Sequence, residues 1–420
     1  MYEILSLGNG LRAALVPIEG IRSVSVAAFI GVGSRYETEV EAGAAHFIEH
    51  LLFKGTARRP SAQIIAEEIE GLGGMINAST DTEVTTYWAK VASQHFVKAT
   101  DVLIDMLRYS AFAPEDVEKE RQVILEELKM YYDTPDEWVD ILLNQTFWPD
   151  HPLGKDVAGT PDRVSALERP TLRDFYERAY HPQNMVLVVA GYFDRQEVVT
   201  ELRARLEDWA AQPPPHFQPA PEGDLSTRFA CEDRPIEQGH LHLAMPGLHR
   251  YHPDRFTLAL LNAVLGNGMS SRLFLKIREE LGLAYAVGSS LNLLADTGAI
   301  SIYSGVDPSR AVEALQAILV ELDRLAQSPI PQTELEKARE YLKGGIILSL
   351  ENSLSQAGWY GQQALLYPEI RALEEILAEY DAVTREEVQQ MAQTIFDRKK
   401  FVLAAVGPFG TGEMLKGLLG

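Results

Sequence analysis

The sequence has little cysteine and no long hydrophobic run. Its single cysteine, Cys231, excludes an internal disulfide framework and a structural zinc site built from several cysteines. No apolar run reaches the roughly 18 residues that a membrane-spanning helix requires. The N-terminal stretch also lacks the basic and apolar segments of a secretory signal. We therefore expect a cytoplasmic protein that has no membrane partner.

Basic residues are scarce relative to acidic ones. The chain has 38 Lys and Arg against 60 Asp and Glu, which gives a net charge of −22 at pH 7. Such a charge argues against a nucleic-acid partner and favours cationic substrates. The hydrophobic share of 46% is typical of a folded globular protein, and 420 residues are enough for two or three domains.

The chain predicts an α+β fold that is built twice. Residues 3–30 and 75–91 are rich in strand formers, 42–56 and 61–72 have helical patterns, and further helices lead to a strand at 185–190. Residues 211–224 then contain five prolines, and beyond them a similar order of elements begins again. VLVVAG ending at Gly191 matches VLAAVG ending at Gly407, and EKER around Lys119 matches EKAR around Lys337.

We therefore expect two tandem similar domains, each a mostly antiparallel sheet packed with helices. Residues 1–211 would form the first domain, 212–226 a proline-rich linker, and 227–420 the second domain.

The segment AGAAHFIEHLLFKGT, residues 42–56, carries the most distinctive motif. His46, Glu49 and His50 stand in the order H-x-x-E-H and share one face of the predicted helix, so both imidazoles can reach one metal ion beside the carboxylate. Core histidines satisfied by hydrogen bonds are the alternative. The pattern of three such residues on a nearly all-apolar helix favours a zinc-hydrolase site.

A third ligand is needed, because catalytic zinc usually has three protein ligands. The predicted helix EDVEKERQVILEELKMYYD places Glu120 and Glu127 on its apolar side, two turns apart. We expect Glu127 to be the third ligand and Glu120 to support a ligand from behind. Glu126 is the rival ligand, although its helix phase places it on the same face as lysines. Alternatively, the inward glutamates bind no metal and each pairs with a buried arginine.

Together these residues resemble the pitrilysin/insulinase family of zinc metallopeptidases, which includes the mitochondrial processing peptidases. The resemblance covers nearly the whole chain and rests on HFIEH at 46–50, ERQVILEEL around Glu127, NAST at 77–80, HPLGKDVAGT at 151–160 and GMSSRLFLKIREELGLAY at 268–285. It implies Zn²⁺ held by His46, His50 and Glu127, with Glu49 as the base.

The resemblance also assigns roles outside the motif. It implies that Arg278 and Tyr285 bind the peptide carbonyl, and that Asn77, Ala78, Ser79 and Thr80 begin an exposed edge strand to which an extended peptide adds. The expected activity is that of a zinc metalloendopeptidase acting on short or unfolded peptides in a chamber between chains.

Half-size members of that family work as pairs of chains. This chain carries both the zinc motif and the Arg/Tyr pair, so a homodimer is expected, with a heterodimer as the alternative. LGNGMSS at 265–271 lacks the long glycine-rich loop of the mitochondrial partner subunit. A non-catalytic assembly subunit of the same fold is the rival interpretation.

Overall fold

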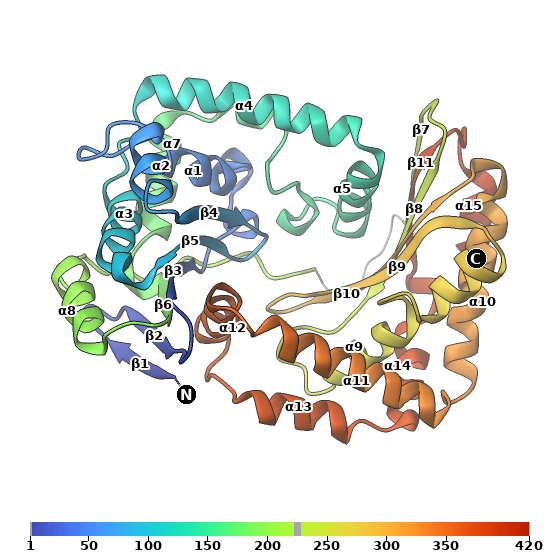
Figure 1. Cartoon of the computed structure of the whole chain (residues 1–420). Coiled ribbons are helices and arrows are strands. Elements are labelled where there is room, and N and C mark those ends of the chain that lie inside the picture. The colour runs from blue at the N-terminus through green and yellow to red at the C-terminus, as the bar shows by residue number, and fades with distance from the viewer. Residues whose placement is uncertain (1, 222–227, 420) are drawn as a thin grey trace. The chain divides into compact units, whose positions relative to one another are not determined.

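The computed structural model describes residues 2–221 and 228–419, and these residues form two compact units (Figure 1). The first unit contains residues 2–129, 155–218 and 347–371. The second contains 130–154, 219–221, 228–346 and 372–419. Each unit has its own sheet, which is described below by itself.

The sheet of the first unit has the strand order β1-β2-β6-β3-β5-β4. All neighbouring strands are antiparallel except β2 and β6, which are parallel. The strands are β1 (Glu3–Ser6), β2 (Arg12–Pro17), β3 (Ser23–Ile30), β4 (Met75–Thr80), β5 (Thr85–Ala92) and β6 (Met185–Gly191). In the described part of the chain, β4 pairs on one side only and is therefore an edge strand.

The sheet of the second unit repeats this order as β7-β11-β8-β10-β9. Here too one pair is parallel, β7 with β11, and the others are antiparallel. The strands are β7 (Phe229–Asp233), β8 (Gly239–Pro246), β9 (Ala284–Leu293), β10 (Gly298–Val306) and β11 (Val402–Gly407). β6 and β11 hold equivalent places and carry the two matching VLVVAG and VLAAVG strings, so the predicted duplication and the α+β class are confirmed.

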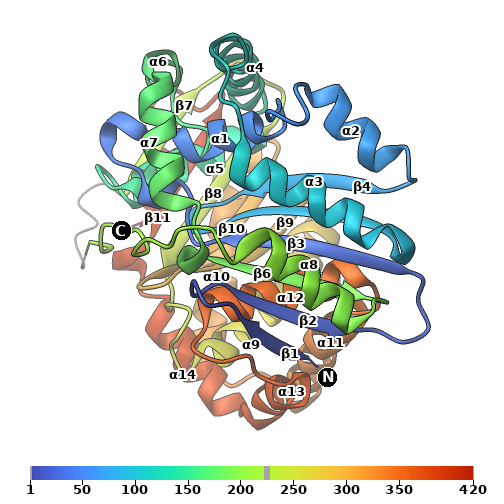
Figure 2. The same ribbon diagram turned by 90° about the vertical axis from the view of Figure 1, so that its left-hand side faces the viewer.

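Helices cover both faces of the first sheet. Side chains alternate between the two faces along each strand, and in β3 and β6 the side chains on both faces are buried. Ala27 and Phe29 of β3 pack against α12, where Ser25 and Ser353 also exchange a hydrogen bond of 2.9 Å. On the other face lie α3 and α8 (Figure 2). The helices of this unit are α1 (Ala44–Leu52), α2 (Ala62–Glu70), α3 (Phe96–Tyr109), α4 (Pro114–Asp133, whose last turn belongs to the second unit), α6 (Pro161–Ala166), α7 (Arg169–Ala179), α8 (Arg195–Leu206) and α12 (Ser353–Leu366).

The second sheet is enclosed in the same way. Val402, Ala404 and Val406 of β11 face α5, while Leu403 and Ala405 face the larger core made with α9, α10 and α14. The helices of this unit are α5 (Pro135–Phe147), α9 (Arg255–Leu265), α10 (Ala311–Gln327), α11 (Gln332–Ser349, whose last residues belong to the first unit), α13 (Leu373–Ala382), α14 (Arg385–Ile395) and α15 (Glu413–Lys416).

The two units do not follow the division at 211 and 227 that the sequence predicts. The stretch 130–154, with α5, belongs to the second unit, and the stretch 347–371, with α12, belongs to the first. Each of these helices covers a sheet from the other half of the chain. The amphipathicity of a helix does not specify which sheet that helix covers. The proline-rich segment therefore divides the strands between the two units correctly, but it does not divide all of the helices. Residues 222–226 of the expected linker lie outside the described residues.

Every helix in the described part of the chain is too short or too polar to cross a lipid bilayer.

Candidate metal centre

The H-x-x-E-H motif lies on α1, and its start is fixed by two neighbours. Gly43, at the N-cap, has a φ of 92°, and a Cβ there would lie 2.8 Å from the carbonyl oxygen of Ala158. The carboxylate of Glu37 accepts hydrogen bonds from the backbone N–H groups of Gly43 and Ala45, at 2.8 and 2.7 Å. The carboxyl group of Glu37 thus satisfies N–H groups at the start of the helix that have no partner within it, so Glu37 stabilises the helix that carries the motif.

The two histidines and Glu127 of α4 converge. The Nε2 atoms of His46 and His50 lie 3.8 and 3.7 Å from Oε2 of Glu127. One ligand atom from each side chain falls within 4.8 Å of the others, the only such group of three His, Cys, Asp or Glu in the described part of the chain. Tetrahedral zinc with ligands at ordinary bond lengths would place its donor atoms roughly 3.4 Å apart, so this donor set fits a zinc ion after small adjustments.

Helix phase separates the two neighbouring glutamates of α4. Glu126 points outward and forms an ion pair of 2.6 Å with Lys129. Glu127 is half-buried beside the histidines. Of the two, Glu127 is the one that the structure brings to the pair of imidazoles.

The protonation of the histidines also suits a metal. Burial lowers the pKa of His46 to about 4, with the neighbouring His50 acting in the same sense, so the ring is neutral at pH 7 as a ligand must be. Nδ1 of His46 has no hydrogen-bond partner among the described residues, which leaves Nε2 as the atom that faces Glu127.

Glu120 lies behind His50, as expected for a supporting residue. Its Oε2 is 3.1 Å from Nδ1 of His50, and its Oε1 is 2.7 Å from Nζ of Lys54. Burial alone would raise the pKa of Glu120, but the hydrogen bonds from His50 and Lys54 outweigh burial and lower it. The resulting carboxylate orients His50 with Nε2 toward Glu127.

Glu49 lies beside this group and is held by the edge strand. Its Oε2 accepts a hydrogen bond of 2.5 Å from the hydroxyl of Thr80, at the end of β4. Burial raises the pKa of Glu49, which makes it a stronger base than an exposed glutamate. Thr80 therefore joins the predicted base to the predicted peptide-binding strand.

A pocket of 380 Å³ opens beside Glu49 and His50. It lies between α1, α2 and β4, and its wall combines apolar side chains with charged ones, among them Lys54 and Glu70. Asn77 of β4 also lines it, while Ala78 and Ser79 continue along the same strand. The pocket is large enough to accept a side chain of a ligand that lies along β4.

Arg278 and Tyr285 come together in the second unit. Arg278 lies on the helix Phe274–Glu280, and Tyr285 lies on β9. The guanidinium carbon is 5.5 Å from the centre of the Tyr285 ring and 4.8 Å from that of Phe274, and 75% of Tyr285 is exposed. The pair is thus accessible to a ligand.

Three features of the site are absent from the sequence prediction: the Glu37 cap, the Lys54 contact and the pocket. Glu37 stands seven residues before the motif helix, outside the N-cap and first turn where capping signals occur, so no local pattern identifies it. The pocket depends on how α2 packs, which no local pattern reveals.

Comparison with known proteins supplies the family. Residues 12–161 match the family model described as insulinase (peptidase family M16), and residues 166–342 match the model described as the peptidase M16 inactive domain. A zinc protease of Mycobacterium leprae is 38% identical over 98% of this chain and 92% of its own length. The chain belongs to peptidase family M16. A second relative, a Bacillus subtilis protein also named a zinc protease, is 36% identical over 98% of this chain and 99% of its own.

Solved structures show the same fold. A protease from Helicobacter pylori has a TM-score of 0.92 and 24% identity, and the match covers 97% of this chain and 99% of the other. A chain of complex III2 from Candida albicans has a TM-score of 0.85 at 19% identity, covering 99% of each chain. The M16 fold is therefore shared by a protease and by a chain of complex III2, and the residues at the site must decide the function.

Proposed function

We propose that this M16 chain is a zinc-dependent endopeptidase that hydrolyses short or unfolded peptides. The observation that carries the proposal is the convergence of His46, His50 and Glu127 within 4.8 Å, with the half-buried carboxylate of Glu49 on the same helix as the histidines. The naming of two full-length relatives as zinc proteases supports it. A zinc ion bound there would act as a Lewis acid and make water nucleophilic near neutral pH.

The residues around the ion have separate tasks. His46, His50 and Glu127 would hold the metal, and Glu120 orients His50 through a hydrogen bond to its Nδ1. Glu49 takes the proton from the attacking water and delivers it to the nitrogen of the leaving amine, a task that its raised pKa favours.

The substrate binds as an extended strand. A peptide that adds to the free edge of β4 would place its backbone beside Glu49, which Thr80 holds against the end of this strand. The neighbouring pocket of 380 Å³ would receive one side chain of the peptide. The net charge of −22 favours basic peptides.

We further propose that the chain works as a homodimer enclosing a chamber, in which Arg278 and Tyr285 stabilise the oxyanion at the zinc site of the partner chain. Each such donor would contribute about 3 kcal/mol to transition-state stabilisation. Size-exclusion chromatography with light scattering on the chain expressed alone tests this. An active dimer is expected, whereas an inactive monomer would favour a heterodimer in which this chain is only the zinc-bearing subunit.

The second candidate is a non-catalytic assembly subunit. The match to an M16 domain described as inactive and the structural likeness to a complex III2 chain favour it. The intact group of His46, His50, Glu127 and Glu49 favours the peptidase, because an assembly role places no demand on these residues.

Glu49→Gln tests the assignment of the base. The amide cannot accept the proton of the attacking water, so hydrolysis of a quenched fluorescent peptide should fall by at least about 100-fold while zinc content stays unchanged. Full activity in Glu49→Gln would exclude Glu49 as the base. An inactive wild type that binds zinc would support the assembly role.

A further inference from the structure

The first unit contains a second pocket, of 480 Å³, which shares no lining residue with the pocket beside Glu49. It lies where the C-terminal end of α3, the helix α7 and residues 209–212 meet. Nothing in the proposed peptidase mechanism uses it. Its wall combines aromatic rings, two arginines and a buried histidine.

The aromatic part of the wall is built on Tyr176, Tyr109 and Trp209. The hydroxyl of Tyr176 donates a hydrogen bond of 2.5 Å to the carbonyl oxygen of Leu107, and its ring centre is 5.0 Å from that of Tyr180. Tyr109 is 51% exposed, and Trp209 is half-buried. Tyr109 and Trp209 therefore offer accessible aromatic surface to a planar ligand.

The cationic part consists of Arg108 and Arg173. The guanidinium carbon of Arg108 lies 5.0 and 5.2 Å from the ring centres of Tyr109 and Trp209. Its carboxylate partner is Asp208, at 2.8 Å, while Arg173 bonds to Glu177 at 3.0 Å.

Both carboxylate partners are mainly exposed, with 75% of the Asp208 side chain and 57% of the Glu177 side chain accessible. An exposed ion pair such as Arg173–Glu177 contributes little stability. A ligand anion can therefore replace Glu177 beside Arg173 at small cost, and it can compete with the exposed Asp208 for Arg108, whose own side chain is 10% exposed.

His181 gives the pocket a polar group at depth. Only 1% of it is exposed, and no described residue makes a hydrogen bond of ordinary geometry to either ring nitrogen. Burial lowers the pKa of His181, although the nearby Pro213 carbonyl opposes this effect, so the ring is neutral at pH 7. A buried polar group without a partner is costly, and a ligand oxygen that reaches it would satisfy it.

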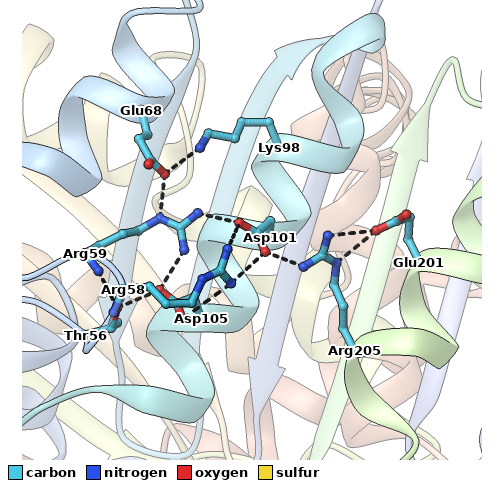
Figure 3. A network of polar contacts seen from close by, with 9 residues as sticks. All are labelled: Thr56, Arg58, Arg59, Glu68, Lys98, Asp101, Asp105, Glu201 and Arg205. Atoms are coloured by element: carbon cyan, nitrogen blue, oxygen red, sulfur yellow. Dashed lines mark hydrogen bonds and ion pairs between the residues drawn. The ribbon is translucent and has the colours of Figure 1, made fainter.

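The pocket is also held in shape. Its wall includes Ala57 and Ser110, and Ser110 forms a β-bridge with Thr56. The hydroxyl of Thr56 donates to Asp105, which belongs to a network of ion pairs between the α1–α2 loop, α3 and α8 (Figure 3). A wall fixed in this way lowers the entropy cost of binding.

We propose that this pocket is a binding site for a small aromatic anion, a planar ring that carries a phosphate or carboxylate. The ring of the ligand packs against Tyr109 and Trp209, the anion pairs with Arg173 and Arg108, and an oxygen of the ligand bonds to His181. The site is separate from the peptidase site and does not depend on the proposed function.

Phenyl phosphate and 4-hydroxybenzoate test the proposal, since they present the two anions on the same ring. Titration is followed by tryptophan fluorescence, and Trp209→Phe identifies the signal that comes from the pocket. One of the two should bind with a Kd of about 1 mM or below, and inorganic phosphate and phenol, which carry only one half of the recognised chemistry, should each bind about tenfold more weakly or worse.

Arg173→Gln and Arg310→Gln form the matched pair of variants. Arg310 also makes an exposed ion pair, with Glu313, and lies in the second unit. Arg173→Gln should weaken binding by about tenfold, and Arg310→Gln should leave it unchanged. Equal binding by Arg173→Gln and wild type, a signal that survives Trp209→Phe, or probes that bind no better than phosphate or phenol would each overturn the proposal.

Discussion

Glu37 shows how much of the metal centre depends on a residue outside it. Its carboxylate accepts the first backbone N–H groups of the motif helix, and burial raises its pKa from 4.5 to about 8, with the charge of Glu41 acting in the same sense and that of Lys155 opposing it. A buried carboxyl at this place is both a helix cap and a group that titrates near neutral pH.

The raised pKa of Glu37 predicts a pH-dependent stability. Between pH 4.5 and about 8 the folded protein holds a proton that the unfolded chain has released, so the free energy of unfolding falls as pH rises. For one group the slope reaches at most about 1.4 kcal/mol per pH unit. Urea denaturation with a chelator present, between pH 6.5 and 8, should show this slope in wild type and a flatter one in Glu37→Gln.

The pH range is chosen to lie above the one in which His46 titrates, since its pKa is lowered to about 4. In that lower range His46 acts in the opposite sense, because the unfolded chain binds the proton more readily and stability rises with pH. Identical slopes for wild type and Glu37→Gln would contradict the raised pKa.

At this scale the sequence predicts the convergent residues well. The helix phase that separates Glu127 from Glu126 is correct, because one apolar face sets the orientation of a whole helix. Val123 of the same helix is apolar, yet the structure leaves it 49% exposed. Deviations of this kind arise because neighbouring elements, and not helix periodicity alone, decide what is covered.

Among the elements, the loop from α1 to α2 is fixed by an ion network (Figure 3). Arg59, only 3% of whose side chain is exposed, bonds to Glu68, Asp101 and Asp105. Asp105 is almost fully buried, so removing its cation leaves an uncompensated charge.

Arg59→Met should therefore destabilise the protein by about 3–5 kcal/mol. Arg195→Met is the matched control, because Arg195 makes an exposed pair with Glu3 and its loss should cost about 1 kcal/mol or less. Urea denaturation curves measure both. Equal and small losses for the two variants would show that the buried network contributes no more than a surface pair.

Glycines in two helices, α11 and α12, should respond in opposite ways to replacement by alanine. Gly344 and Gly345 lie inside α11, and a Cβ at either would meet no atom within 4 Å. Gly361 of α12 lies against Phe29 of β3, where a Cβ would be 2.1 Å from a ring carbon.

Alanine at Gly344 or Gly345 should stabilise the protein by about 0.5–1 kcal/mol, because glycine is a poor helix former. Gly361→Ala should destabilise it by about 1–3 kcal/mol through overpacking. Thermal unfolding of the three single variants tests this, and a loss of stability at Gly344 would mean that its neighbours are closer than described.

The sequence predicts many of the helices and strands, but it predicts neither α8 and β7 nor where α5 and α12 pack. Both are apolar on one side, and each covers the sheet of the other half of the chain. The spacing of apolar residues indicates that one face of a helix is buried, but it does not identify the sheet that buries this face.

For the whole molecule, the central claim is that an M16 fold carries a working zinc centre. The fold is shared with a chain of complex III2, and the claim therefore rests on four side chains, three from α1 and one from α4: His46, Glu49, His50 and Glu127. The net charge of −22 of the whole chain would favour basic peptides.

The most direct test compares Glu127→Gln with Glu126→Gln, which remove the same charge one residue apart. Zinc content and hydrolysis of a basic quenched peptide are measured on each purified protein. Glu127→Gln should lose at least about tenfold in zinc affinity, and hydrolysis should fall with it, while Glu126→Gln should match wild type in both. Full zinc content and full activity in Glu127→Gln, or losses in Glu126→Gln instead, would contradict the account.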